Sequence, residues 1–121
     1  MQILIKRVYD SPTPADGLRV LIDRLWPRGL TKAAAAVDLW AKDLAPSKEL
    51  RTWFSHEDEK FAEFTRRYRT ELNKNTPALE IQLTSSDHNT ITLLYSAKNK
   101  TSNNALVLQA WLQQRFNEAL S

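Results

Sequence analysis

The segment that most constrains the fold is residues 18–25 (LRVLIDRL), a near-continuous apolar run. A strand that is apolar on both faces is typical of an α/β sheet covered by helices on each side. Residues 2–8 (QILIKRV) and 90–95 (TITLLY) are also rich in strand-forming side chains. The loop at 9–17, with two prolines and a glycine, is short for a parallel crossover. It leaves open whether the first two strands are parallel or form a wide hairpin.

Helical patterns fill the intervals between the strands. We expect helices at 33–36, 47–54, 57–74, 76–85 and about 103–119. Ser47 is a candidate N-cap, and the segment 55–58 (SHED) resembles a capping box that opens the third helix. Apolar side chains in this third helix and in the last one recur every three or four residues and form one buried stripe on each. Residues 38–44 (DLWAKDL) fit either a strand or a helix, and we favour a short strand with Trp40 inside.

Strands separated by helices predict a layered fold. The sequence therefore indicates one α/β domain over residues 1–121. We expect three layers, with a small, mostly parallel or mixed sheet of about four strands flanked by helices.

The residue types that are missing exclude several kinds of site. The chain has no cysteine, which excludes disulfides and cysteine-ligated metal and indicates a reducing compartment. His56 and His88 are the only histidines and have no metal-ligand spacing, and two glycines cannot build a phosphate loop. We therefore expect no metal and no cofactor. With no signal peptide and no membrane-spanning run, we expect a cytoplasmic protein without membrane contact.

The strongest candidate site follows the ends of two predicted strands, where ligands of open α/β sheets bind. Residues 23–29 (DRLWPRG) offer the guanidinium groups of Arg24 and Arg28 beside the ring of Trp26. Arginine makes forked hydrogen bonds to phosphate or carboxylate, and tryptophan stacks on flat ligands. The structural alternative is that Asp23 pairs with an arginine while Trp26 fills the core. If the strands are parallel neighbours, this loop faces residues 95–99 (YSAKN).

Catalysis is the weaker interpretation of these loops. Lys98 follows Ser96 by two residues, and a lysine of lowered pKa can activate a serine. The spacing matches no established serine–lysine signature, and anion binding by Lys98 is favoured over catalysis. His56 is the first candidate for an acid or base, because it follows an aromatic pair. The sequence leaves open whether any reaction is catalysed.

Long strings of this chain resemble a known family. They are RVYD (7–10), DGLRVLIDRLWPRGLTK (16–32), WAKDLAPSKELRTWFSH (40–56), FAEFTRRYRTEL (61–72), and TLLYSAKN with NNA (92–99, 103–105). In this order, they resemble the YeaO-like proteins, domain-of-unknown-function family 488. The resemblance implies a compact α/β domain of bacteria and archaea with no established activity. Two positions depart from the family pattern: Ser55 replaces a common glycine, and Asn99 replaces a common aspartate.

The resemblance and the physical argument meet at one set of residues. They are Arg24, Trp26, Arg28, Lys42, Ser47, Arg51, His56, Tyr95, Ser96 and Lys98. Core packing explains tryptophan and leucine in such strings, but it does not readily explain so many cations. Our leading hypothesis is a cationic pocket for a small anionic ligand bearing phosphate or carboxylate. Its predicted ligand-binding residues include Lys42, Arg51 and Tyr95, and any chemistry would fall to Ser96 or His56.

Two other classes of function stay open. The helix at 57–74 carries Arg66, Arg67 and Arg69, which could bind a nucleic-acid backbone as part of a regulatory module. A solvated helix face is the favoured reading, because Tyr68 is expected to point to the core. The third class is a protein–protein adaptor with an exposed apolar patch.

Overall fold

The computed structural model describes residues 2–75 and 89–120, and its centre is a four-stranded sheet. The strands are β1 (Gln2–Arg7), β2 (Leu18–Leu21), β3 (Leu39–Trp40) and β4 (Thr90–Tyr95). Their order is β1-β4-β2-β3, and every neighbouring pair is parallel. The first two strands are therefore parallel but unpaired, because β4 lies between them.

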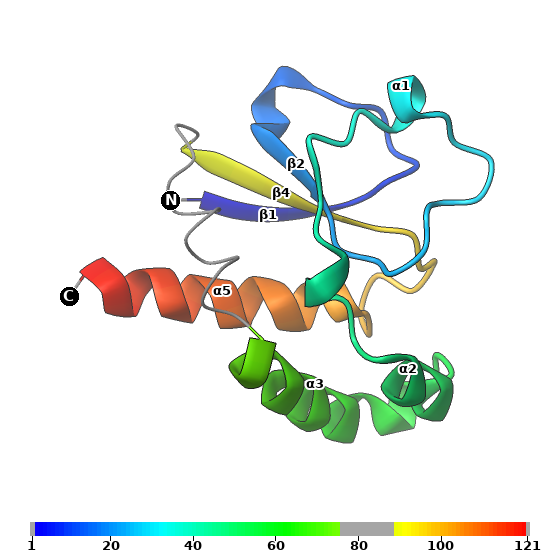
Figure 1. Cartoon of the computed structure of the whole chain (residues 1–121), viewed down its shortest axis with the longest axis vertical. Helices are drawn as coiled ribbons and strands as arrows, with labels where there is room; N and C mark the ends of the chain where they lie inside the picture. The colour runs from blue at the N-terminus through cyan, green and yellow to red at the C-terminus, as the bar shows by residue number, and fades with distance from the viewer. Residues whose placement is uncertain (1, 76–88, 121) are drawn as a thin grey trace.

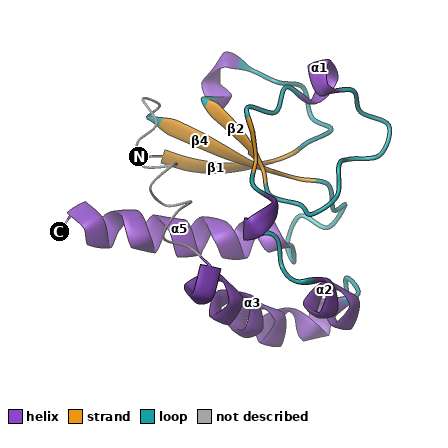
Figure 2. Cartoon of the chain, viewed as in Figure 1, coloured by secondary structure: helices purple, strands orange, loops and turns teal. Residues whose placement is uncertain are grey.

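Helices cover both faces of this sheet (Figures 1 and 2). One face packs against α2 (Lys48–Phe54), α3 (Phe61–Asn75) and α5 (Asn104–Leu120). The other face lies under the short helices η1 (Pro14–Asp16) and α1 (Lys32–Ala35). Two further 3-10 turns, η2 (Lys42–Leu44) and η3 (Asp58–Lys60), join these elements. The predicted three-layer α/β fold is confirmed, and the sheet is wholly parallel.

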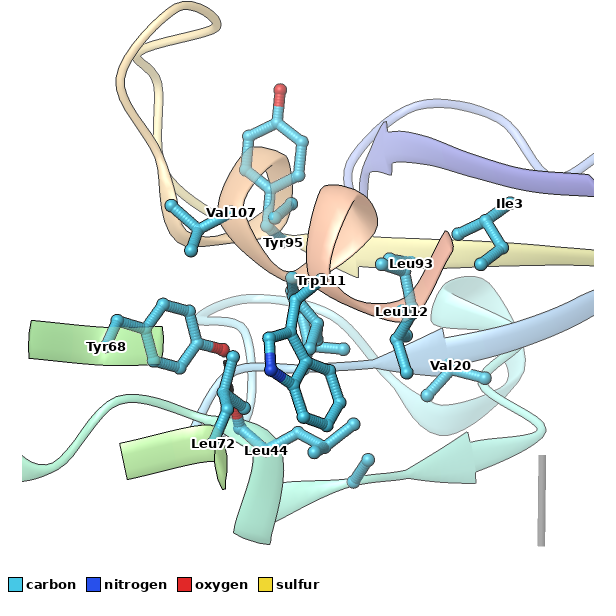
Figure 3. Packing of buried hydrophobic residues seen from close by; sticks show 14 of the residues in the cluster. Ile3, Val20, Leu44, Tyr68, Leu72, Leu93, Tyr95, Val107, Trp111 and Leu112 are labelled. Carbon is cyan, nitrogen blue, oxygen red and sulfur yellow. Dashed lines mark hydrogen bonds between the residues drawn. The ribbon is translucent and has the colours of Figure 1, made fainter. Parts of the chain in front are cut away.

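The larger core lies between the sheet and the long helices (Figure 3). Val20 and Leu93 supply its strand side, and the helix side includes Trp111 and Leu112. Tyr68 of α3 is fully buried there and donates its hydroxyl hydrogen to the carbonyl of Leu44. Burial, followed by the charges of Asp23 and Glu71, raises the pKa of this phenol well above its ordinary value. The predicted buried stripes of α3 and α5 are confirmed by Phe64, Tyr68 and Leu72 and by Leu108, Trp111, Leu112 and Phe116.

A buried ion pair fastens the other face of the sheet. The Arg19 Nη1 lies 2.5 Å from an oxygen of Asp16, and both residues are about 5% exposed or less. The same guanidinium donates to the carbonyls of Ala35 and Ala36 at the end of α1. Burial alone would raise the pKa of Asp16, but hydrogen bonds from Thr13, Arg19 and Lys6 lower it from 3.8 to about 2. This one network joins η1, β2 and α1.

Two local predictions were wrong, and a third, the short strand that includes Trp40, was confirmed only in part. The second strand ends at Leu21 rather than at residue 25, because Asp23 turns away to bind the loop after β4. The strand expected at 38–44 is only Leu39–Trp40, and η2 follows it. The capping box at 55–58 does not form: Ser55 and His56 have left-handed backbones (φ 49° and 58°) and end α2 instead. The helix expected at 76–85 and the turn containing His88 lie outside the described residues.

Candidate functional site

The carboxyl ends of β2 and β4 meet at Asp23 and Ser96. One Asp23 carboxylate oxygen accepts from the Ser96 backbone N–H (2.9 Å) and from its hydroxyl (2.7 Å). The other oxygen accepts from Asn104 in the first turn of α5 (3.1 Å). Because β2 and β4 are parallel neighbours, their following loops lie together, as the sequence predicted. Asp23 serves here as the junction of both loops with α5.

The predicted nucleophile and its predicted lysine do not meet. The Ser96 hydroxyl donates to Asp23, so its only proton is already engaged. Lys98 is exposed, and no hydrogen bond joins it to Ser96 in the described structure. His56 is exposed in the turn after α2, where its ring lies 6.3 Å from that of Phe54. None of the three is arranged with the others as a catalytic group.

The ring of Trp26 packs within the protein. It meets Trp40 edge-on, with 5.3 Å between ring centroids, and its Nε1 donates to the Leu30 carbonyl (2.7 Å). The Lys42 ammonium lies over the Trp40 ring, with its Nζ 3.9 Å from the ring centroid. Trp40 in turn donates to the Asp23 carbonyl (2.8 Å). The structure thus places Trp26 and Lys42 in an aromatic cluster that braces the loop carrying Arg24 and Arg28.

Arg7 lies at the same edge, at the end of β1, and was not among the predicted site residues. Its guanidinium donates to the Ala97 carbonyl (3.0 Å) and to the Ser96 carbonyl (3.2 Å). It also lies over the ring of Tyr9, whose hydroxyl donates to the Arg28 carbonyl (2.9 Å). The family string RVYD contains both residues and is the one signal that could have found them.

Two predicted ligand residues have polar atoms or rings inside the protein. Tyr95 is 4% exposed; burial raises the pKa of its phenol, an effect that Arg7 opposes and Asp10 reinforces. Its hydroxyl points away from the cluster around Trp111 (Figure 3). Arg51 lies in α2, and its Nε is fully buried without a hydrogen-bond partner among the described residues. Leaving such a group unpaired costs roughly 1–3 kcal/mol.

A cavity of about 410 Å³ opens beside this edge of the sheet. The described residues that line it are Arg24, Asp43, Ala45, Ser47, Glu71 and Lys74. Glu71 binds Ser47 twice, through the backbone N–H (2.8 Å) and the hydroxyl (2.6 Å). Ser47 also accepts from the Leu50 N–H, so it caps α2 as predicted. Arg24 is the one predicted ligand residue among the described residues that line this cavity.

The arginines of α3 are engaged with the protein itself. Arg66 and Arg67 both bind the carboxylate of Glu63, and the Arg67 guanidinium also lies 4.2 Å from the Trp53 ring centroid. Arg69 donates to Gln114 of α5 (3.0 Å). One carboxylate, that of Glu63, therefore pairs with two of the three arginines of α3.

Comparison with known proteins places the chain in a family. The model described as "Inactive DUF488-N3 subclade" matches residues 2–120. The chain belongs to this DUF488-N3 subclade. The uncharacterised protein YeaO of Escherichia coli is 45% identical over 113 residues, which cover 93% of this chain and 98% of YeaO. The uncharacterised protein Rv3073c of Mycobacterium tuberculosis is 38% identical over 114 residues, which cover 94% and 96% of the two chains. No solved structure matches the chain.

The resemblance seen in the sequence is thereby confirmed, and the relatives of this DUF488-N3 protein carry no named activity. The described residues contain no group of three histidine, aspartate or glutamate side chains that could hold a metal ion. Within the same residues, no helix is long and apolar enough to cross a membrane.

Proposed function

We propose that this DUF488-N3 protein is a binding domain for a small ligand with an anionic group, such as a carboxylate or a phosphate. The site is the cavity beside the Asp23–Ser96 contact. The observation that carries the proposal is that Arg24 and Lys74 line this cavity without a hydrogen bond or ion pair to any described residue. An unpaired guanidinium is well suited to forked hydrogen bonds with such groups.

The surroundings of the cavity support an anionic ligand. Arg28 and Lys98 are exposed on the two loops at the same edge of the sheet, and their side chains make no ion pair in the described chain. Cations gathered at one edge raise the local positive potential and the rate at which anions arrive. The Trp26–Trp40 contact braces the backbone of the loop that carries Arg24. Ligand binding therefore costs little conformational entropy in this loop.

Several observations support binding rather than catalysis. The Ser96 hydroxyl is engaged by Asp23, and His56 lies exposed in the turn after α2. The matching family model carries the word "inactive" in its description. A site that orients a ligand without a free nucleophile or a paired acid and base fits a binding role.

The two rival functions find less support. The arginines of α3 that would bind nucleic acid are engaged by Glu63 and by Gln114. A protein–protein adaptor would need an exposed apolar surface. Among the described residues, the large apolar side chains that are exposed are Tyr9 and Leu25. Two such residues fall short of the contiguous patch that marks a docking face.

The test is thermal melting of the protein with inorganic phosphate, glycerol 3-phosphate, acetate, glutarate and 5-aminopentanoate, each of which carries an anionic group, at matched ionic strength. A ligand of the folded state raises the melting temperature by mass action. We expect a rise in the wild type that Arg24→Gln abolishes. Arg66→Gln is the matched control, because Arg66 is an exposed arginine of α3 that belongs neither to the cavity lining nor to the loops after β2 and β4. No rise with any probe, or an equal loss in both variants, would overturn the proposal.

A further inference from the structure

Among the described residues that line the cavity, positive and negative side chains are equal in number. Arg24 and Lys74 supply two cations, and Asp43 and Glu71 supply two carboxylates. A site of this balance offers little net attraction to a ligand with two negative charges, because each carboxylate of the wall opposes part of the gain from each cation. The site is therefore best suited to a ligand whose own positive and negative charges nearly cancel.

The two carboxylates differ in what they already bind. Glu71 accepts from the Ser47 backbone N–H and from its hydroxyl, so it belongs to the cap of α2. Asp43 is exposed in η2, and its carboxylate has no hydrogen bond or ion pair to any residue that the structure describes. Among the described lining residues, Asp43 is thus the carboxylate that is left to receive a cation from outside the chain.

The remaining lining limits what kind of ligand fits. Ala45 is the one apolar side chain among the described lining residues. Binding sites for drug-sized molecules are mostly apolar and run from roughly 300 to 1,000 Å³. This cavity lies at the small end of that range and is mostly polar, so it suits a small polar molecule rather than an aromatic or lipid one.

From these three observations we infer that the ligand is a small zwitterion of the amino-acid class. Its carboxylate lies against Arg24 and Lys74, and its ammonium lies against Asp43. This inference rests on the proposed function and adds the cationic end of the ligand to it. Arg24 selects for the anion, and Asp43 discriminates between an amino-carboxylate and a plain dicarboxylate.

The experiment compares two probes of similar length by NMR titration of the ¹⁵N-labelled protein. 5-Aminopentanoate carries one carboxylate and one ammonium, whereas glutarate carries a carboxylate at each end. We expect 5-aminopentanoate to bind at least about threefold more tightly, which is the scale of a partly exposed ion pair. Asp43→Asn removes that preference, and Asp10→Asn, which changes an exposed aspartate outside the cavity lining, retains it.

The outcomes separate this inference from the proposed function. If glutarate binds as tightly as 5-aminopentanoate or more tightly, and Arg24→Gln abolishes that binding, the zwitterion inference is wrong and the proposed anion site is retained. A preference for 5-aminopentanoate that survives in Asp43→Asn also overturns it. Binding of neither probe removes the inference and, together with a flat melting panel, the proposed function. Unchanged melting temperatures of the ligand-free variants show that each remains folded.

Discussion

Asp23 and Ser96 lie 73 residues apart in the sequence and share two hydrogen bonds to one carboxylate oxygen, at 2.9 and 2.7 Å. The contact joins the loops that follow two neighbouring parallel strands. Since Asn104 binds the second oxygen of the same carboxylate, α5 is fixed to this edge as well. The position of Arg24, the next residue along the chain, depends on this junction.

Removing either partner of that contact tests its strength. We expect Ser96→Ala to lower the free energy of unfolding by about 1 kcal/mol, because one hydrogen bond to a charged acceptor is lost. Asp23→Ala leaves three donors without their acceptor and is expected to cost about 3 kcal/mol. Urea denaturation of both single variants and the double variant gives their coupling. Strictly additive losses would contradict a direct contact.

Low pH is expected to weaken the fold through Asp16. Its pKa is about 2 in the folded protein against an ordinary value of 3.8, so above pH 4 it contributes its full stabilisation. As the pH falls from about 4 to 2, the unfolded chain takes up the proton first, and roughly 2 kcal/mol is lost. Urea denaturation between pH 7 and pH 2 measures this.

The matched variant for that experiment is Asp16→Asn. It should be less stable than the wild type at pH 7 and should lose less stability between pH 4 and 2. Glu63, whose pKa is also lowered to about 2 by its bonds to Arg66 and Arg67, is present in both proteins and cancels in the comparison. Parallel pH curves for the two proteins would contradict the role given to Asp16.

The two glycines are expected to respond differently to a methyl group. Gly17 has φ 61°, and a Cβ there would lie 2.2 Å from the carbonyl oxygen of Thr90, which is backbone and cannot move aside cheaply. We expect Gly17→Ala to cost more than about 3 kcal/mol or to prevent folding. Gly29 has φ 82° but open space around it, so Gly29→Ala should cost about 1 kcal/mol. Thermal melting ranks them, and equal losses would be the contrary result.

Arg51 offers a substitution that stabilises the protein. Its buried Nε has no partner in the described chain, so Arg51→Met removes an unsatisfied group while keeping much of the side-chain volume. We expect a gain of about 1 kcal/mol in the free energy of unfolding, measured in urea. Arg19→Met is the control and should be strongly destabilising, since Arg19 pairs with Asp16 and donates to Ala35 and Ala36. A loss of stability in Arg51→Met would show that its guanidinium has a partner.

Local patterns were sufficient where the cause of a structure is local. Strand β4 follows from its β-branched and apolar residues, and the caps at Thr31 and Ser47 follow from hydroxyls placed before helical segments. The stripe of Phe64, Tyr68 and Leu72 follows from helical spacing. The pattern at 55–58 misled because Ser55, although serine is typical of helix starts, takes a left-handed backbone and ends α2. The close stacking of Phe54 on Phe64, with ring centroids 4.3 Å apart, accompanies the left-handed turn at Ser55 that closes α2 there.

The sequence by itself determined an α/β fold, because strand and helix patterns are local properties. It predicted that the loops at 23–29 and 95–99 meet only if their strands are parallel neighbours, and the structure supplied that pairing. Only the tertiary structure decided which cations are free. Lys42 lies on Trp40, Arg7 binds the loop after β4, and Arg24 lines the cavity. It also decided that Asp43 and Lys74, 31 positions apart by their numbering, line one cavity. The sequence gives the position of each charged residue along the chain, but whether that charge is paired depends on which distant elements pack beside it.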